Sequence, residues 1–208
     1  MLAKKTTYLI LVILGLCFVI EASAQSRLYP KGRDSSKNSL TAYATRVDSL
    51  LLNNRKLNCF AFTIRPSFTG EQGCYYDKKS SELVLRIANK NIWYSKNIEI
   101  KEYRCKISDE TAKSIEQLFY AAILSSSYLA TPNGLDGETY ELLVNGGYYT
   151  AECWSPKKNT NCYKLVEILE TLASATKEND HVAIENITPK IEELTKEFES
   201  LFPEDVKK

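Results

Sequence analysis

The sequence predicts an α+β protein built around an antiparallel β-sheet. Segments rich in β-branched and aromatic residues are grouped before and between amphipathic helical segments, rather than alternating one by one with helices as in a parallel sheet. Clusters of turn residues separate these segments at short intervals, which is typical of antiparallel strands. We expect about five to seven strands packed with three helices, plus an amphipathic helix at the C-terminus.

The N-terminal part of the 208-residue chain predicts export. Two lysines precede an apolar run over residues 8–20, and the sequence Ala-Ser-Ala follows at residues 22–24. A basic start, a short apolar core and small residues in this order are typical of a secretory signal peptide. An uncleaved anchor would need about 20 apolar residues. We expect residues 1–24 to be removed after Ala24, a secreted or periplasmic location, and membrane contact only through this transient signal.

The mature chain is predicted to be one domain with a segment on each side. Residues 25–38 lack hydrophobic periodicity and are expected to form an exposed leader. The single α+β domain covers residues 39–176, and residues 177–208 form an acidic C-terminal helical appendage. The mature chain keeps 25 basic and 25 acidic residues, and because the appendage holds five lysines and nine acids, the body carries a net charge of +4. This balance gives no strong basic footprint, so we expect no nucleic-acid partner.

The first helix and the strands after it follow from the spacing of apolar residues. A first helix is predicted, with Ser39 or Asn38 as its cap, because apolar residues recur at helical intervals at Leu40, Tyr43, Val47, Leu50 and Leu51. From residue 57 onward the composition changes to strand-forming residues. The predicted strands are 57–65, 74–77, 82–87, 92–94 and 97–107. In the last strand the apolar residues change parity midway, which predicts either a β-bulge or two short strands with a bend.

Three helices and a hairpin are predicted in the second half of the chain. Ser108 before two acids predicts a helix N-terminus, because the hydroxyl caps the first turn and the acids face the positive end of the helix dipole. Asn145 and Gly146 predict a hairpin turn, because both central positions of that turn need positive φ. The hairpin strands are 138–144 and 148–154, and the last two helices are expected over 161–176 and from Pro189 onward.

The single histidine argues against most histidine-dependent chemistry. His181 lies in the predicted linker 177–188, outside the predicted helices and strands. A catalytic triad needs an oriented imidazole, and a zinc site usually needs several nitrogen or thiolate ligands at close spacing. The sequence also contains no motif for nucleotide or phosphate binding. We therefore predict no catalytic residue, no metal ligand and no cofactor.

The cysteines permit a disulfide without fixing its partners. Five remain after removal of the signal peptide, and an exported protein meets an oxidising compartment. They are Cys59, Cys74, Cys105, Cys153 and Cys162. Cys153 ends a predicted strand and Cys162 begins a helix nine residues later, so this pair is the candidate disulfide. The alternative, that several of them are small buried apolar residues, stays open.

Two glutamates are the candidates for acid–base chemistry. Glu141 and Glu152 are expected on the same face of the predicted hairpin, opposite the apolar residues of its two strands. Glycoside hydrolases use two carboxylates that flank the sugar bond. The more common explanation for such a pair is a solvated strand face that carries like charges.

The most distinctive local sequence lies at the open end of this hairpin. Strand pairing brings Asp136 and Gly137 close to Trp154 and Ser155 at one corner of the sheet. Such a corner could stack against and hydrogen-bond a sugar or a peptide. The structural alternative is that Asp-Gly forms a turn and the indole packs over the end of the sheet. Tyr148 is a further candidate for binding, because exposed tyrosines favour recognition surfaces.

The same segment carries a family resemblance. The pattern D-G-x-x-Y at residues 136–140, followed by W-S-P at 154–156 and an apolar helix, resembles a pattern in uncharacterised secreted bacterial proteins. The resemblance covers residues 134–172 and brings no known activity. Together, these features predict an exported, non-enzymatic binding or interaction protein with an unknown protein or glycan ligand. The alternative is a carboxylate-dependent hydrolase that acts on a glycan.

Overall fold

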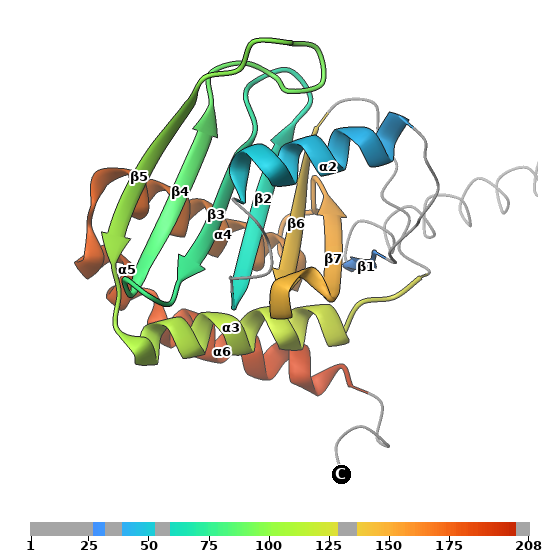
Figure 1. Ribbon diagram of the computed structural model, residues 1–208. Coiled ribbons are helices and arrows are strands. Elements are labelled where there is room, and N and C mark those ends of the chain that lie inside the picture. The colour runs from blue at the N-terminus through green and yellow to red at the C-terminus, as the bar shows by residue number, and fades with distance from the viewer. Residues whose placement is uncertain (1–26, 32–38, 53–58, 129–136, 203–208) are drawn as a thin grey trace, which may run out of the picture.

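The structure is a computed structural model that describes residues 27–31, 39–52, 59–128 and 137–202 (Figure 1). The predicted signal peptide, most of the predicted leader and Asp136 lie outside the described residues. Among the helices that are described, none is long and apolar enough to cross a membrane.

Seven strands form one antiparallel sheet in the order β1-β7-β6-β2-β3-β4-β5. The predicted α+β class is therefore confirmed. The strands are β1 (Tyr29–Pro30), β2 (Phe60–Pro66), β3 (Gln72–Asp77), β4 (Glu82–Ala88), β5 (Ile100–Lys106), β6 (Glu138–Val144) and β7 (Tyr149–Trp154). The β6–β7 turn has positive φ at Asn145 and Gly146, as the hairpin prediction requires.

Helices cover both faces of the sheet (Figure 1). They are α2 (Ser39–Leu51), α3 (Asp109–Leu124), α4 (Asn161–Glu178), α5 (His181–Asn186) and α6 (Thr188–Ser200). The α3 helix begins as predicted, since the Ser108 hydroxyl accepts a hydrogen bond from the amide of Thr111 at 3.1 Å. His181, expected in a linker, instead begins the short helix α5.

The main core lies between the sheet and the helices α3, α4 and α6. Phe60 stacks on Tyr76 with ring centroids 5.5 Å apart, and Phe119 of α3 meets Phe60 edge to face. The predicted appendage contributes to this core through α5 and α6. Its buried residues are Ile184, Ile191, Leu194 and Phe198. The acidic C-terminal segment thus packs on the domain through its apolar face.

The other face of the sheet is covered by α2, and this explains a departure from the predicted strands. Tyr75 is buried beneath α2 while its neighbour Tyr76 is buried in the main core, so β3 is buried on both faces. Ile98 and Ile100 pack with α2. Strand β5 then pairs with β4 in continuous register, without the predicted bulge. The apolar residues change parity because Ile98 and Ile100 are covered by α2, whereas Cys105 and Ile107 face the main core on the other side of the sheet.

Part of the predicted exposed leader belongs to the fold. Leu28 is buried in the main core, and Tyr29 and Pro30 pair with β7 as the edge strand β1. The expectation of an exposed leader is wrong for these residues. A single buried leucine and a two-residue strand are too short to give hydrophobic periodicity, so the sequence pattern did not reveal them.

Antiparallel pairing places several connections at one end of the sheet, here called the loop end. It comprises the β2–β3 loop, the β4–β5 loop, the residue before β6 and the residues after β7. The β3–β4 and β6–β7 turns lie at the opposite end, here called the turn end (Figure 1).

Candidate functional site

Three exposed aromatic side chains gather on the two loops of the loop end. Phe68, on the β2–β3 loop, is 74% exposed, and Tyr94, on the β4–β5 loop, is 73% exposed. Trp93 is 43% exposed, because its ring packs edge to face against Tyr43 of α2 with centroids 5.0 Å apart. We call Phe68, Trp93 and Tyr94 the aromatic platform. Adjacent exposed aromatic residues are a feature of recognition surfaces.

Asn91 fixes the backbone that carries the platform. Its side-chain oxygen accepts hydrogen bonds from the amides of Trp93, at 3.0 Å, and Tyr94, at 3.4 Å. Its buried amide nitrogen approaches three carbonyl oxygens of the β2–β3 loop at 3.1–3.5 Å, those of Pro66, Ser67 and Thr69. One buried side chain therefore joins the two loops and orders the turn below the indole.

Glu71 and Arg46 bind the backbone of the β4–β5 loop. The fully buried Glu71 carboxylate accepts hydrogen bonds from the Ile92 amide at 2.7 Å and the Tyr43 hydroxyl at 2.8 Å. Burial and this hydrogen bond to Glu71 raise the pKa of Tyr43. Arg46 of α2 donates to three carbonyl oxygens of the β4–β5 loop, those of Ile92, Ser95 and Lys96. The exposed rings thus rest on a backbone with buried, satisfied polar contacts.

Gly70 allows the two loops to approach each other. A Cβ atom at this position would lie 1.9 Å from the carbonyl oxygen of Ala88 and 3.3 Å from the amide nitrogen of Lys90. Both of these are backbone atoms, so any larger residue would push the loops apart. The close approach keeps the two loops that carry Phe68 and Trp93 side by side.

The corner predicted from the sequence is joined to this surface. Ser67 donates its amide and its hydroxyl to the carbonyl oxygen of Gly137 at 3.0 and 2.9 Å. The Ser155 hydroxyl accepts from the Glu138 amide at 3.0 Å. Gly137 has a φ of +154°, and a Cβ there would lie 2.8 Å from the Trp154 indole. The indole therefore packs over Gly137, and the corner is a packed edge, as the structural alternative predicted.

The predicted binding residues do not form one site. Gly137, Trp154 and Ser155 lie together at the loop end, whereas Asp136 is outside the described residues. Tyr148 is 71% exposed but follows the β6–β7 turn at the turn end. It is separated from Trp154 by the length of β7, about 20 Å at 3.3 Å per residue.

Sequence reasoning did not identify the aromatic platform. The segment Ile92–Tyr94 was predicted as a strand, and it is a turn. The prediction is wrong because the Asn91 side chain satisfies the amides of the next residues, which competes with strand pairing. An Asn placed two residues before a Trp, directly after a turn cluster, is the signal that could have indicated this.

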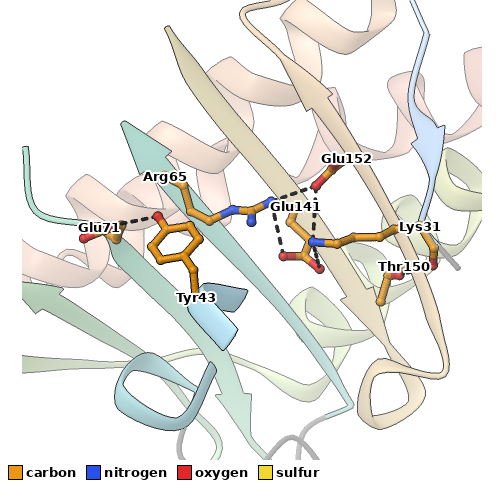
Figure 2. Close-up of polar contacts among 7 residues, drawn as sticks. All are labelled: Lys31, Tyr43, Arg65, Glu71, Glu141, Thr150 and Glu152. Atoms are coloured by element: carbon orange, nitrogen blue, oxygen red, sulfur yellow. Dashed lines mark hydrogen bonds and ion pairs between the residues drawn. The ribbon is translucent and has the colours of Figure 1, made fainter. Parts of the chain in front are cut away.

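The predicted glutamate pair lies on the face of the sheet that α2 covers (Figure 2). Glu141 and Glu152 are direct cross-strand partners on β6 and β7, as their parity predicted. Arg65 of β2 places Nη2 at 2.7 Å from Glu152 and at 3.5 Å from Glu141. Lys31 Nζ lies at 3.3 Å from each carboxylate. Two cations thus balance two anions in a shared cluster.

This cluster is not the solvated strand face that the simpler explanation expected. The side chains of Glu141 and Glu152 are only 3% and 15% exposed. Burial works against the charged form of Arg65, but the attraction of the two carboxylates raises its pKa. A hydrolytic acid must carry a proton at working pH, whereas each of these carboxylates lies against the same two cations, Arg65 and Lys31. The arrangement is therefore that of an ion network and not of an acid–base pair.

Two grooves elsewhere are each lined by residues that include one ion pair. The larger, about 790 Å³, lies between α4 and α6, where Lys164 forms a 2.7 Å ion pair with Glu197. The smaller, about 590 Å³, lies beside β5 near His181, where Arg104 pairs with Glu82 at 3.0 Å. Neither groove has the exposed aromatic side chains of the loop end.

The cysteines are thiols in this structure. Four are buried and Cys59 is half-buried. The candidate disulfide between Cys153 and Cys162 is not formed, although their side chains are in hydrogen-bond contact. This hydrogen bond, together with burial, raises the pKa of the Cys153 thiol, and burial also raises that of Cys59, Cys105 and Cys74. These thiols lack the lowered pKa that redox chemistry requires.

Alkaline pH should therefore destabilise the reduced protein through Cys74. Burial raises the pKa of Cys74 from 9.0 to about 12. Below pH 9 both states keep the proton, and between the two pKa values only the unfolded chain loses it. The free energy of unfolding should then fall by up to about 1.4 kcal/mol per pH unit. Urea unfolding between pH 8 and 10.5 measures the total slope, to which the other thiols with raised pKa also contribute, and Cys74→Ala should reduce it by the share of Cys74. An unchanged slope in that variant would contradict the assignment.

Comparison with known proteins assigns no family to the chain. No protein-family model matches it, and no curated protein matches it. The function is therefore inferred from the arrangement of its residues.

Proposed function

We propose that the protein is an exported, non-enzymatic binding protein that captures an extended ligand, a glycan or a peptide, at its loop end. The proposal rests on one observation above all. Three aromatic side chains are exposed on two loops whose backbone is held by buried polar residues. Grouped aromatic rings that are exposed to water are a feature of binding sites. Because their backbone is already ordered, little conformational entropy is lost when a ligand binds. Export follows from the predicted signal peptide.

The shape of the loop end supports an extended ligand. From β7 to the β4–β5 loop it crosses five neighbouring strands of the sheet, a width of about 19 Å at 4.8 Å per strand. Phe68 lies on the β2–β3 loop and Trp93 and Tyr94 on the β4–β5 loop, and the half-buried Trp154 marks the β7 end of this width. Successive units of a chain could therefore contact Phe68, Trp93 and Tyr94 and extend towards the Trp154 corner.

Binding is favoured over the alternative of a carboxylate-dependent hydrolase. Glu141 and Glu152 are both paired to Arg65 and Lys31, and they lie on a face of the sheet rather than on the loops. Retaining and inverting hydrolases both need one carboxyl group in its protonated form. The ion network supplies a structural role for the same residues, so no observation on this chain favours the hydrolase.

Removing the Trp93 ring should abolish most of the binding. Ring truncation at the centre of a recognition surface typically costs 2 kcal/mol or more, so we expect Trp93→Ala to weaken binding at least about ten-fold. The probes are polygalacturonate, heparin, dextran and a casein digest, and the readouts are affinity electrophoresis and calorimetry on the mature chain. Circular dichroism and the urea midpoint establish that the variant is folded.

Tyr148→Ala is the matched control, because Tyr148 is also an exposed aromatic residue but lies at the turn end. It should bind as the wild type does. The proposal is contradicted if none of the four probes binds the wild-type protein, or if a probe binds Trp93→Ala and the wild type equally well.

A further inference from the structure

We infer that the ligand of the aromatic platform is an anionic glycan, whose sugar rings stack on the aromatic side chains and whose acidic groups pair with the lysines around them. This inference rests on the proposed function and names the class of its ligand. It is carried by the charges at the loop end, which the platform itself does not explain.

Four exposed lysines surround the platform and the adjoining corner. Lys90 and Lys96 flank Trp93 on the β4–β5 loop, and Lys157 and Lys158 follow the Trp154 corner. Among the described residues, none of the four takes part in an ion pair. Elsewhere in the described part of the chain, some basic residues have acidic partners, namely Lys31, Arg65, Arg86, Arg104 and Lys164. The exposed Lys78 and Lys79 at the turn end have none within that part, so the loop end differs from the turn end in placing its lysines around exposed aromatic side chains.

Acidic groups in the described part of the loop end do not neutralise these lysines. Glu71 is fully buried and bound by the loop amide and Tyr43. Glu138 accepts a hydrogen bond from the Tyr140 hydroxyl. Among the described residues of these loops, only Glu99 is an exposed carboxylate. Part of the net positive charge of residues 25–176 is therefore located at the loop end, where it attracts anions.

Stacking and charge together select the ligand class. The Trp93 ring is held by its edge-to-face contact with Tyr43, so its exposed part presents a fixed flat surface. The apolar face of a sugar ring fits such a surface. Lysine ammonium groups on flexible stems suit carboxylate or sulfate groups that recur along a chain at variable positions. A lipid surface shares the negative charge, but it favours aromatic side chains that can insert freely.

The test compares one polymer in two charge states. Polygalacturonate should bind, and the same polymer with its carboxylates methyl-esterified should bind at least about ten-fold more weakly, because the ionic contacts are lost. Heparin serves as a second anionic glycan. Binding of both anionic polymers should weaken as NaCl is raised from 50 to 300 mM. Calorimetry on the mature protein gives the dissociation constants.

Charge reversal locates the contact. Lys90→Glu combined with Lys96→Glu should weaken polygalacturonate binding at least about ten-fold. Lys78→Glu combined with Lys79→Glu changes the charge equally at the turn end and should leave binding unchanged, since both lysines are exposed there. Vesicles of phosphatidylglycerol in phosphatidylcholine should show no Trp93-dependent binding.

Several outcomes would overturn the inference. The inference fails if the esterified polymer binds as well as polygalacturonate, or if neither anionic glycan binds. It also fails if the vesicles bind in place of the glycans, or if both double variants lose binding equally. Trp93-dependent binding of dextran or peptides alone would leave the proposed function standing while the inference fails. If no probe shows binding that depends on Trp93, both the proposed function and the inference are contradicted.

Discussion

Replacing Arg65 by methionine should lower the free energy of unfolding by about 3–5 kcal/mol, because removal of one partner leaves buried charges without compensation. Arg65 Nη2 is the closest cation to Glu152, at 2.7 Å, and it also faces Glu141. Lys31 remains in the variant, but its side chain is 30% exposed and lies 3.3 Å from each acid. Urea unfolding at pH 7 measures the change.

The ionic origin of this loss is testable by neutralising the acids. Adding Glu141→Gln and Glu152→Gln to Arg65→Met should recover most of the stability, because the uncompensated charges are then removed. Arg104→Met is the matched control. Arg104 also pairs with glutamates, but its side chain is 43% exposed, so its loss should cost less than about 1 kcal/mol. Similar losses for Arg65 and Arg104, or no recovery in the triple variant, would argue against a buried network.

Asn91→Ala should destabilise the protein by about 2–4 kcal/mol and should also remove binding at the loop end. The variant leaves the Trp93 amide and the carbonyl oxygens of the β2–β3 loop without their partner, and unpaired buried polar groups cost about 1–3 kcal/mol each before water relieves some of them. Urea unfolding measures the stability. Polygalacturonate binding, measured well below the unfolding midpoint, reports whether the platform has lost its order.

Asn89→Ala is the control in the same loop. The Asn89 side chain accepts from the Glu99 amide at 3.0 Å, but both residues are exposed and water can replace the bond. We expect a loss below about 1 kcal/mol and unchanged binding. If Asn91→Ala binds as tightly as the wild type, the platform does not depend on its buried support.

The elements of the fold were predictable where local signals are strong. Ser108 marked the start of α3, and the Asn145-Gly146 turn marked the β6–β7 hairpin, because capping and positive φ depend on a few neighbouring residues. Features that depend on contacts distant in sequence were not predictable. Strand β1 is defined by its pairing with β7, and the parity change around Ile98 is explained only by the presence of α2.

In the candidate site, too, the local features were predictable and the contacts between distant segments were not. Parity within one hairpin was sufficient to place Glu141 opposite Glu152, and hairpin pairing was sufficient to bring Gly137 near Trp154. The cations of the ion network come from β2 and the residue after β1, more than 75 residues away from Glu141, so no local pattern indicates them. Exposure of an aromatic residue likewise depends on which elements cover it. Tyr75 lies under α2, whereas Tyr94 does not.

A titration of the ¹⁵N-labelled protein, expressed from residue 25 onward, with short galacturonate oligomers tests most directly whether the loop end is the recognition surface. The readout is the change in amide chemical shifts. We predict that the shifts concentrate in residues 67–71 and 89–99 and in the residues that follow Trp154, with the indole signal of Trp93 among the largest. Shifts that concentrate instead along the α4–α6 groove, or around Glu141 and Glu152 on the sheet face, would contradict the account.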